Sequence, residues 1–199
     1  MNIVIIKYNA GNIESVNNAL NRLGVNAEIT ADPDKIINAD KVIFPGVGEA
    51  STTMQYLRKN ELDKLIVSLK QPVLGICLGL QLMCSHSEEG DTTCLGIFDE
   101  PVKRFIPEPG KEFIDKVPHM GWNSISNTIG DLFSEKIENQ YFYFVHSYYA
   151  GLGEHTAAIS NYIVPFSAAL QKDNFYATQF HPEKSGTIGA EILENFIKL

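Results

Sequence analysis

The chain has 199 residues, of which 44% are hydrophobic, so it is long enough for one compact domain with a sizeable core, and we expect a single domain over residues 1–199. Its net charge of −8 and the lack of a basic cluster argue against nucleic acid as a partner. The start "MNIVIIKYNA" has no basic segment or cleavage site of a signal peptide, and no apolar run is long enough to span a bilayer. We therefore expect a cytoplasmic protein that does not bind a membrane.

The first half of the chain alternates strand and helix signals. "IVIIKY" (3–8) is a continuous apolar run, typical of a parallel strand covered on both faces. Apolar residues at helical spacing follow from Ile13 and stop at Gly24, which predicts a helix. Further expected elements are strands at 27–30, 41–46 and 72–77 and a helix within 50–70. The predicted order is β-α-β-β-α-β.

The second half is rich in β-branched and aromatic residues. We expect strands within 94–106, 140–149, 157–160 and 167–180, with a hairpin turn at Lys172-Asp173-Asn174. A last amphipathic helix has Ala190, Leu193, Phe196 and Ile197 on one face. The fold class that this predicts is a three-layer α/β domain, with a mixed, mostly parallel central sheet flanked by helices and a smaller β-rich portion.

The most informative short motif is "GICLGLQ" (75–81), at the point where a predicted strand gives way to a helix. Gly75, Cys77 and Gly79 have the spacing of a nucleophile elbow, with cysteine in place of serine. Such a turn strains the backbone and brings strand and helix close together, which glycine tolerates. The helix start would favour a thiolate. The alternative is a buried cysteine packed at a strand end.

The other cysteines, Cys84 and Cys94, form no Cys-x-x-Cys pair with Cys77 or with each other. The odd number and this spacing argue against a disulfide framework or a zinc site. We expect free thiols and neither a metal nor a cofactor.

A cysteine nucleophile needs a base, and His181 in "QFHPEKSG" is the best placed of the five histidines. Glu183 lies two residues further on, so both side chains would project to the same side of an extended chain. A carboxylate beside the imidazole can hold its tautomer and stabilise the imidazolium. The alternative is a surface turn. A third motif, "FPGVGEA" (44–50), ends another strand, and its backbone N–H groups together with that of Leu78 could form an oxyanion hole.

Together, Cys77, the pair His181 and Glu183, and "PGVG" resemble the triad class of glutamine amidotransferases, also called class I glutaminases, over nearly the whole chain. Within that class, several motifs are most similar to the glutaminase subunits of imidazole glycerol phosphate synthase, an enzyme of histidine biosynthesis. These motifs are "YNAGNIESV" (8–16), "FPGVGEA", "SEEG" (87–90), "PHMGWN" (118–123) and "HSYY" (146–149).

The resemblance implies a cysteine attack on glutamine, with His181 as base and Glu183 as its orienting group, releasing glutamate and ammonia. The oxyanion hole would comprise Gly46, Val47, Gly48 and Leu78. The head group of glutamine would be held by Gly48, Gln81, Glu89 and the backbone at Ser147 and Tyr148.

Ammonia would have to pass through a dry route to a partner, which the resemblance implies is a cyclase subunit with a (β/α)8 barrel, in a heterodimer. The expected interface residues are Tyr8, Asn12, Pro118, His119, Met120, Gly121, Trp122 and Asn123. The family commonly has an acidic residue and a glycine where this chain has Lys7 and Asn9, so the interface there is expected to differ.

Two kinds of alternative remain open. The first kind is another enzyme, either a glutaminase subunit of another ammonia-using synthase or a cysteine peptidase or amidase of the same architecture. Gln81 and Glu89 argue against the peptidase or amidase. A scaffold without activity is the non-enzyme alternative, and the intact Cys77, His181 and Glu183 argue against it.

Overall fold

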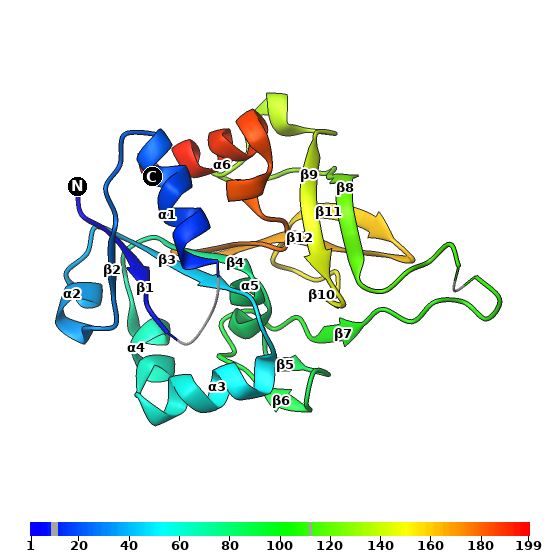
Figure 1. The fold of residues 1–199 in the computed structure, drawn as a ribbon, viewed down its shortest axis with the longest axis horizontal. Coiled ribbons are helices and arrows are strands. Elements are labelled where there is room, and N and C mark those ends of the chain that lie inside the picture. The colour runs from blue at the N-terminus through cyan, green and yellow to red at the C-terminus, as the bar shows by residue number, and fades with distance from the viewer. Residues whose placement is uncertain (9–11, 112) are drawn as a thin grey trace.

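A seven-stranded sheet forms the centre of the computed structural model, which describes residues 1–8, 12–111 and 113–199 (Figure 1). The strand order is β11-β12-β13-β4-β3-β1-β2. The bounds are β1 Ile3–Ile6, β2 Glu28–Thr30, β3 Lys41–Gly46, β4 Val73–Cys77, β11 Thr156–Tyr162, β12 Val164–Lys172 and β13 Phe175–Thr178. The strands from β2 to β13 run parallel, whereas β12 and β11 are antiparallel. The predicted α/β fold with a mixed, mostly parallel sheet is confirmed.

Helices cover both faces of this sheet (Figure 1). The helices are α1 Ile13–Arg22 and α6 Gly186–Lys198 on one face, and α2 Pro33–Ile37, α3 Ala50–Lys59, α4 Leu62–Ser68 and α5 Leu78–Met83 on the other. Successive strand residues point to opposite faces, so Ile3 and Ile5 pack with α1 and α6 while Val4 and Ile6 pack with the other helices. Within the described residues, none of the helices combines the length and apolar character needed to cross a bilayer.

A smaller β-rich portion adjoins the sheet, as expected. It contains a four-stranded sheet, β10-β7-β5-β6, and a two-stranded ribbon of β8 and β9. The bounds are β5 His86–Ser87, β6 Thr92–Thr93, β7 Val102–Arg104, β8 His119–Ser124, β9 Tyr141–His146 and β10 Tyr148–Ala150, with short 3-10 helices at η1 Glu135–Ile137 and η2 Pro182–Lys184. An aromatic core that includes Phe105, Phe144 and Phe166 fills this region.

Several elements differ from the sequence expectations; β5, β6 and β8 were not predicted, and the strand expected within 140–149 is divided into β9 and β10. The helix within 50–70 is two helices, because Glu61 adopts a left-handed conformation with φ 56° and ends the first. Helix α2 was not predicted, although Pro33 follows an Asp32 cap whose carboxylate accepts the Asp34 N–H. Of the strand expected within 94–106, only β7 forms, because backbone N–H groups from Leu95 to Phe98 instead bond to carbonyls at the end of α5.

Helix α5 lies so close to β3 that only glycine fits between them. A Cβ atom on Gly79 would lie 2.1 Å from the carbonyl oxygen of Phe44. A Cβ atom on Gly75 would lie 2.9 Å from Met83 Sδ and 3.1 Å from the Gly79 carbonyl carbon. The two glycines of "GICLG" therefore let the helix start directly above the strand end, as the sequence predicted.

We expect Gly79→Ala to lower the free energy of unfolding by about 1–3 kcal/mol, because the added methyl group meets fixed backbone. Gly151→Ala is the matched control: its Cβ would meet only Pro101 O at 3.8 Å, so the change should stay within about 0.5 kcal/mol. Urea denaturation of both variants measures the difference. Equal midpoints would show that the contact with β3 does not constrain the turn.

Candidate active site

The three motifs singled out in the sequence end on neighbouring strands. Gly46, the last residue of β3, pairs with Cys77, the last residue of β4. On the other side, Thr178 at the end of β13 pairs with Ile76, and the chain continues directly to His181. Because the carboxyl ends of parallel strands share one edge of the sheet, the loops after them meet there.

Cys77 occupies the sharp turn expected of a nucleophile elbow. Its backbone has φ 54° and ψ −107°, which is strained for a residue with a side chain, and α5 begins at the next residue. Its sulfur lies 3.8 Å from the carbonyl oxygen of Val145 and accepts a hydrogen bond from Gln179 Nε2 at 3.6 Å. Burial raises the pKa of the Cys84 thiol and raises that of Cys94 to about 11, so Cys84 and Cys94 favour the protonated form.

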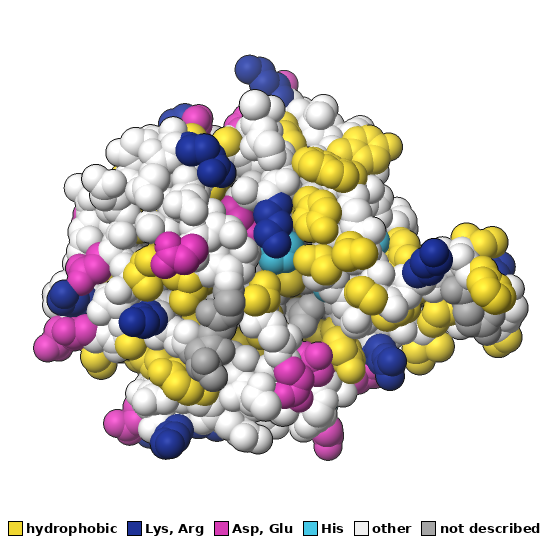
Figure 2. Space-filling view, viewed as in Figure 1, with side chains coloured by type: hydrophobic (Ala, Val, Ile, Leu, Met, Phe, Trp, Pro, Cys, Tyr) yellow, Lys and Arg dark blue, Asp and Glu magenta, His cyan; other side chains and the backbone are white. Residues whose placement is uncertain are grey.

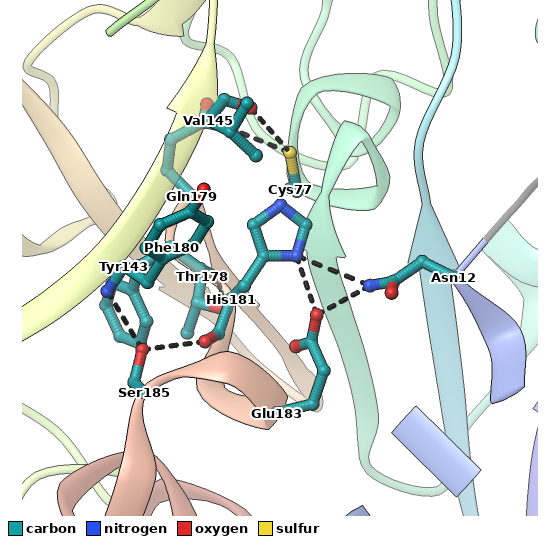
Figure 3. Close-up of polar contacts among 10 residues, drawn as sticks. All are labelled: Asn12, Cys77, Tyr143, Val145, Thr178, Gln179, Phe180, His181, Glu183 and Ser185. Atoms are coloured by element: carbon teal, nitrogen blue, oxygen red, sulfur yellow. Dashed lines mark hydrogen bonds and ion pairs between the residues drawn. The ribbon is translucent and has the colours of Figure 1, made fainter. Parts of the chain in front are cut away.

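His181 and Glu183 form a hydrogen bond in the sealed interior, as Figure 3 shows. Nδ1 of His181 lies 2.7 Å from Oε1 of Glu183, and neither side chain is exposed. Because a carboxylate only accepts, Nδ1 carries the proton and Nε2 of the neutral ring is left as the base. Nε2 has no hydrogen-bond partner within the described part of the chain, and Figure 3 shows it turned toward Cys77.

Asn12 also donates a hydrogen bond to the Glu183 carboxylate. Its Nδ2 donates to Oε1 of Glu183 at 2.5 Å and lies 3.5 Å from Nδ1 of His181. Asn12 adopts a left-handed conformation with φ 72° directly before α1. Glu183 is thus held by two donors, the nearby His181 and the distant Asn12, which limits its rotation.

The charges around His181 favour its protonated form. Burial alone would lower the pKa of His181, but the adjacent Cys77 sulfur and the Glu183 carboxylate outweigh burial and raise the pKa to about 10. An imidazolium beside a sulfur anion is the arrangement that activates a cysteine for nucleophilic attack.

A pocket of about 320 Å³ opens in front of Cys77. It brings together most of the residues predicted to bind substrate or oxyanion: Val47, Gly48, Cys77, Leu78, Gln81, Glu89, Ser147 and Tyr148, together with Val145 and His146. Gly46, which was predicted in the oxyanion hole, is not a lining residue of this pocket; it pairs with Cys77 in the sheet. His181 is not among the residues that line the pocket, and its Nε2 is turned toward the Cys77 sulfur.

Two glutamine side chains connect the pocket to the sulfur. Gln81 Nε2 donates to the carbonyl oxygen of Tyr148 at 2.8 Å and to Gln179 Oε1 at 3.0 Å. Gln179 is fully buried and donates in turn to Cys77 Sγ. Gln179 was not among the expected site residues, although its position two residues before His181 at a strand end gave the same signal that singled out Glu183.

The acid Glu89 is half-buried in the pocket wall. Its Oε2 accepts a hydrogen bond from the backbone N–H of Ala50, at the start of α3, at 2.8 Å. Burial raises the pKa of Glu89, and the Ala50 N–H partly offsets that effect. Glu89 thus places an acidic group in the wall of the pocket.

The residues expected at a partner interface divide into two groups. On β8, Met120 and Trp122 are 67% and 56% exposed, whereas His119 is buried, as a strand's alternation requires. Tyr8 is also buried, and its hydroxyl donates to the Pro45 carbonyl. The side chains of Tyr8 and His119 therefore do not contribute to the surface. Asn9, and Gly11 of the "YNAGNIESV" motif, lie outside the described residues.

Comparisons with known proteins agree with this geometry. Residues 4–199 match the family model "Glutamine amidotransferase class-I". The chain is 60% identical over 199 residues to the imidazole glycerol phosphate synthase subunit HisH of Bacteroides thetaiotaomicron, and 45% identical over 201 residues to that of Escherichia coli. Each alignment covers all of both chains.

Among solved structures, a putative GMP synthase subunit from Thermoplasma acidophilum has the same fold. The TM-score is 0.74 at 22% identity, covering all of this chain and 93% of that one. A structure of PurLQS from Thermotoga maritima matches with a TM-score of 0.68 at 13% identity, covering 99% and 97%. The family match and the full-length identity together show that the chain belongs to the class-I glutamine amidotransferases, in the family of the HisH subunits of imidazole glycerol phosphate synthase.

Proposed function

We propose that this amidotransferase hydrolyses glutamine through Cys77, His181 and Glu183 and passes the ammonia to a cyclase partner that makes imidazole glycerol phosphate in histidine biosynthesis. One observation carries the proposal for the site. The base nitrogen of His181 faces the sulfur of Cys77, and the same sulfur opens on a pocket lined by Gln81 and Glu89.

In the proposed reaction the sulfur anion of Cys77 attacks the side-chain carbonyl carbon of glutamine. The oxyanion accepts hydrogen bonds from backbone N–H groups at Leu78 and in the segment 46–48. The protonated His181 gives its proton to the departing nitrogen, so the C–N bond breaks, ammonia leaves and a thioester remains. His181 then takes a proton from water, whose oxygen attacks the thioester, and glutamate leaves as the sulfur anion returns.

The pocket suits the head group of glutamine. The carboxylate of Glu89 supplies a negative charge for the substrate ammonium, and Gln81 and the backbone at Ser147 and Tyr148 fix its orientation. Gly48, at the exposed end of the pocket, has φ 127° and leaves room for the substrate to enter.

A partner is needed because ammonia in bulk water becomes ammonium, which is not a nucleophile. The partner we propose is a cyclase subunit with a (β/α)8 barrel, in a heterodimer, and the protein would act in the cytoplasm. Its contact surface is proposed on the outer face of β8. There Pro118, Met120 and Ile114 line a groove of about 460 Å³, with Trp122 exposed nearby on the same strand. In Figure 2 hydrophobic side chains gather over the region where Figure 1 places β8 and β9.

We expect Cys77→Ala to lower glutamine turnover in the complex with the cyclase subunit by at least about 10³-fold, because the nucleophile is lost. Cys94→Ala, which removes a thiol outside the pocket, should keep the activity of the wild type. Glutamate release measures both, and peptide substrates should not be cleaved by the wild type. Glutamine hydrolysis that survives in Cys77→Ala would show that another group is the nucleophile.

Glu183→Gln should change the pH profile as well as the rate. The pKa of His181 is raised, so its imidazolium persists below that pKa and is lost above it. Removing the carboxylate charge lowers this pKa, and the alkaline limb of kcat/KM should move to lower pH by at least about one unit. Glu194→Gln, at an exposed position on α6, is the control. An unmoved alkaline limb in Glu183→Gln would mean that Glu183 does not set the charge of the base.

Trp122→Ala should weaken binding of the cyclase partner about 30-fold, the equivalent of about 2 kcal/mol for a buried aromatic anchor. Ile37→Ala, on α2 at the opposite edge of the molecule in Figure 1, removes a comparably exposed apolar side chain and should not change the Kd. Titration of labelled cyclase with each variant gives the two values. If both variants bind like the wild type, the interface lies elsewhere.

A further inference from the structure

Two buried histidines connect the inner face of β8 to the pocket. His119 and His146 face each other across the β8–β9 pair, with Nδ1 of His119 2.9 Å from Nε2 of His146. The ring of His119 stacks between Phe144 and Tyr162, at centroid distances of 5.0 and 4.0 Å. Neither histidine has a role in the chemistry proposed above, yet His146 lines the pocket.

At the Asn123 end of this pair, the structure fixes which atom donates the hydrogen bond and which accepts it. Asn123 Nδ2 donates to the carbonyl oxygen of Asn161 at 2.9 Å, and its Oδ1 accepts from the backbone N–H of Ser124 at 2.8 Å. Both partners are backbone groups, so the amide cannot be reversed. The same Nδ2 lies 3.3 Å from Nε2 of His119. Nε2 must therefore accept, and the proton of a neutral His119 is on Nδ1.

At the Tyr148 end, the hydrogen bonds require the same order of donors and acceptors. Nδ1 of His146 lies 2.7 Å from the carbonyl oxygen of Tyr148, which can only accept, so the proton of His146 is on Nδ1. Its Nε2 then accepts the proton of His119. The Tyr148 oxygen also accepts a hydrogen bond from Gln81 Nε2. With two donors, both of its lone pairs are used. Constraints from opposite ends thus give the same pair of tautomers.

This arrangement of hydrogen bonds requires the rings of His119 and His146 to be neutral. A proton added to His146 would place two N–H groups against each other in the contact with His119. Burial lowers the pKa of His146 to about 3 and that of His119 to about 4, so both rings are neutral near pH 7.

We propose that Asn123, His119 and His146 form a one-directional hydrogen-bond relay that positions the Tyr148 carbonyl, and with it Gln81, in the glutamine pocket. The role of the relay in substrate binding rests on the function proposed above. His119 and His146 are positioning residues, because His119 does not reach the pocket and His146 acts through the Tyr148 peptide. Since the buried His119 and the exposed Met120 are neighbours on β8, a partner seated on the outer face of β8 contacts the strand that holds the start of the relay.

The tautomers give a test that does not depend on activity. Long-range ¹H–¹⁵N spectra of the intact protein near pH 7 report which ring nitrogen of each histidine carries the proton. We expect both His119 and His146 as the neutral Nδ1–H form. An Nε2–H form or an imidazolium at either residue would overturn the relay.

Kinetics in the complex with the cyclase subunit test what the relay does. His119→Phe keeps an aromatic ring between Phe144 and Tyr162 but cannot donate or accept, and we expect KM for glutamine to rise about fivefold to tenfold with kcat within about twofold. His119→Gln, whose amide can both donate and accept, should recover part of the loss. Tyr176→Phe, on β13, removes a hydroxyl that donates to Asp131 outside the relay, the pocket and the proposed partner surface, and should leave KM unchanged.

If His119→Phe folds and its KM equals that of Tyr176→Phe, the relay does not position the substrate site. A KM that His119→Gln fails to recover would also contradict the relay, because packing and not hydrogen bonding would then explain the loss. Failure of the proposed function has a different signature: the wild-type complex would release no glutamate, while the tautomers would still decide whether the relay exists.

Discussion

The hydrogen bond between His181 and Glu183, sealed from solvent, is the interaction on which the rest of the site depends. It fixes the proton on Nδ1 and leaves Nε2 for the sulfur of Cys77. In water such a pair would be weak and mobile. Here both side chains are fully buried, and Asn12 donates a second hydrogen bond to the same carboxylate oxygen. A buried carboxylate without these donors would carry a large desolvation cost, so the three residues depend on one another.

The sheet brings these groups together by its topology. Strands β3, β4 and β13 are neighbours although long stretches of chain separate them, and each ends at the same edge. The sharp turn at Cys77 is possible only because Gly79 allows α5 to touch β3. The strained backbone at residue 77 is therefore maintained by the packing of α5 against β3, and the Cys77 side chain lines the pocket.

The pocket itself is built on polar groups that have little freedom. A chain of hydrogen bonds through Gln81 and Gln179 links the Tyr148 carbonyl to the Cys77 sulfur. His146 donates a further hydrogen bond to the same carbonyl. A buried polar network of this kind specifies one arrangement, because any reversed amide or shifted proton leaves two donors or two acceptors face to face. The substrate site and the inner face of β8 thus share one set of hydrogen bonds.

The sequence by itself determined the local features: the α/β class, most of the elements, the glycines of the elbow, and the family resemblance that singled out Cys77, His181 and Glu183 as candidates. These depend on residues close together in the chain or on short motifs. Local signals failed where a non-glycine residue took a left-handed conformation, as at Glu61, or where N–H groups at 95–98 bonded to a helix end instead of a strand.

Only the tertiary structure decided which distant polar groups meet. Asn12 reaches Glu183 across 171 positions and Gln179 reaches Cys77 across 102, and no periodicity in a single sequence specifies such a pair. The same holds for the tautomers of His119 and His146, which follow from backbone carbonyls and amides fixed by the packing of β8 against β9. Hydrophobic patterning determines which face of an element is buried, whereas the partner of each buried polar atom depends on the register and approach of the elements in the folded chain.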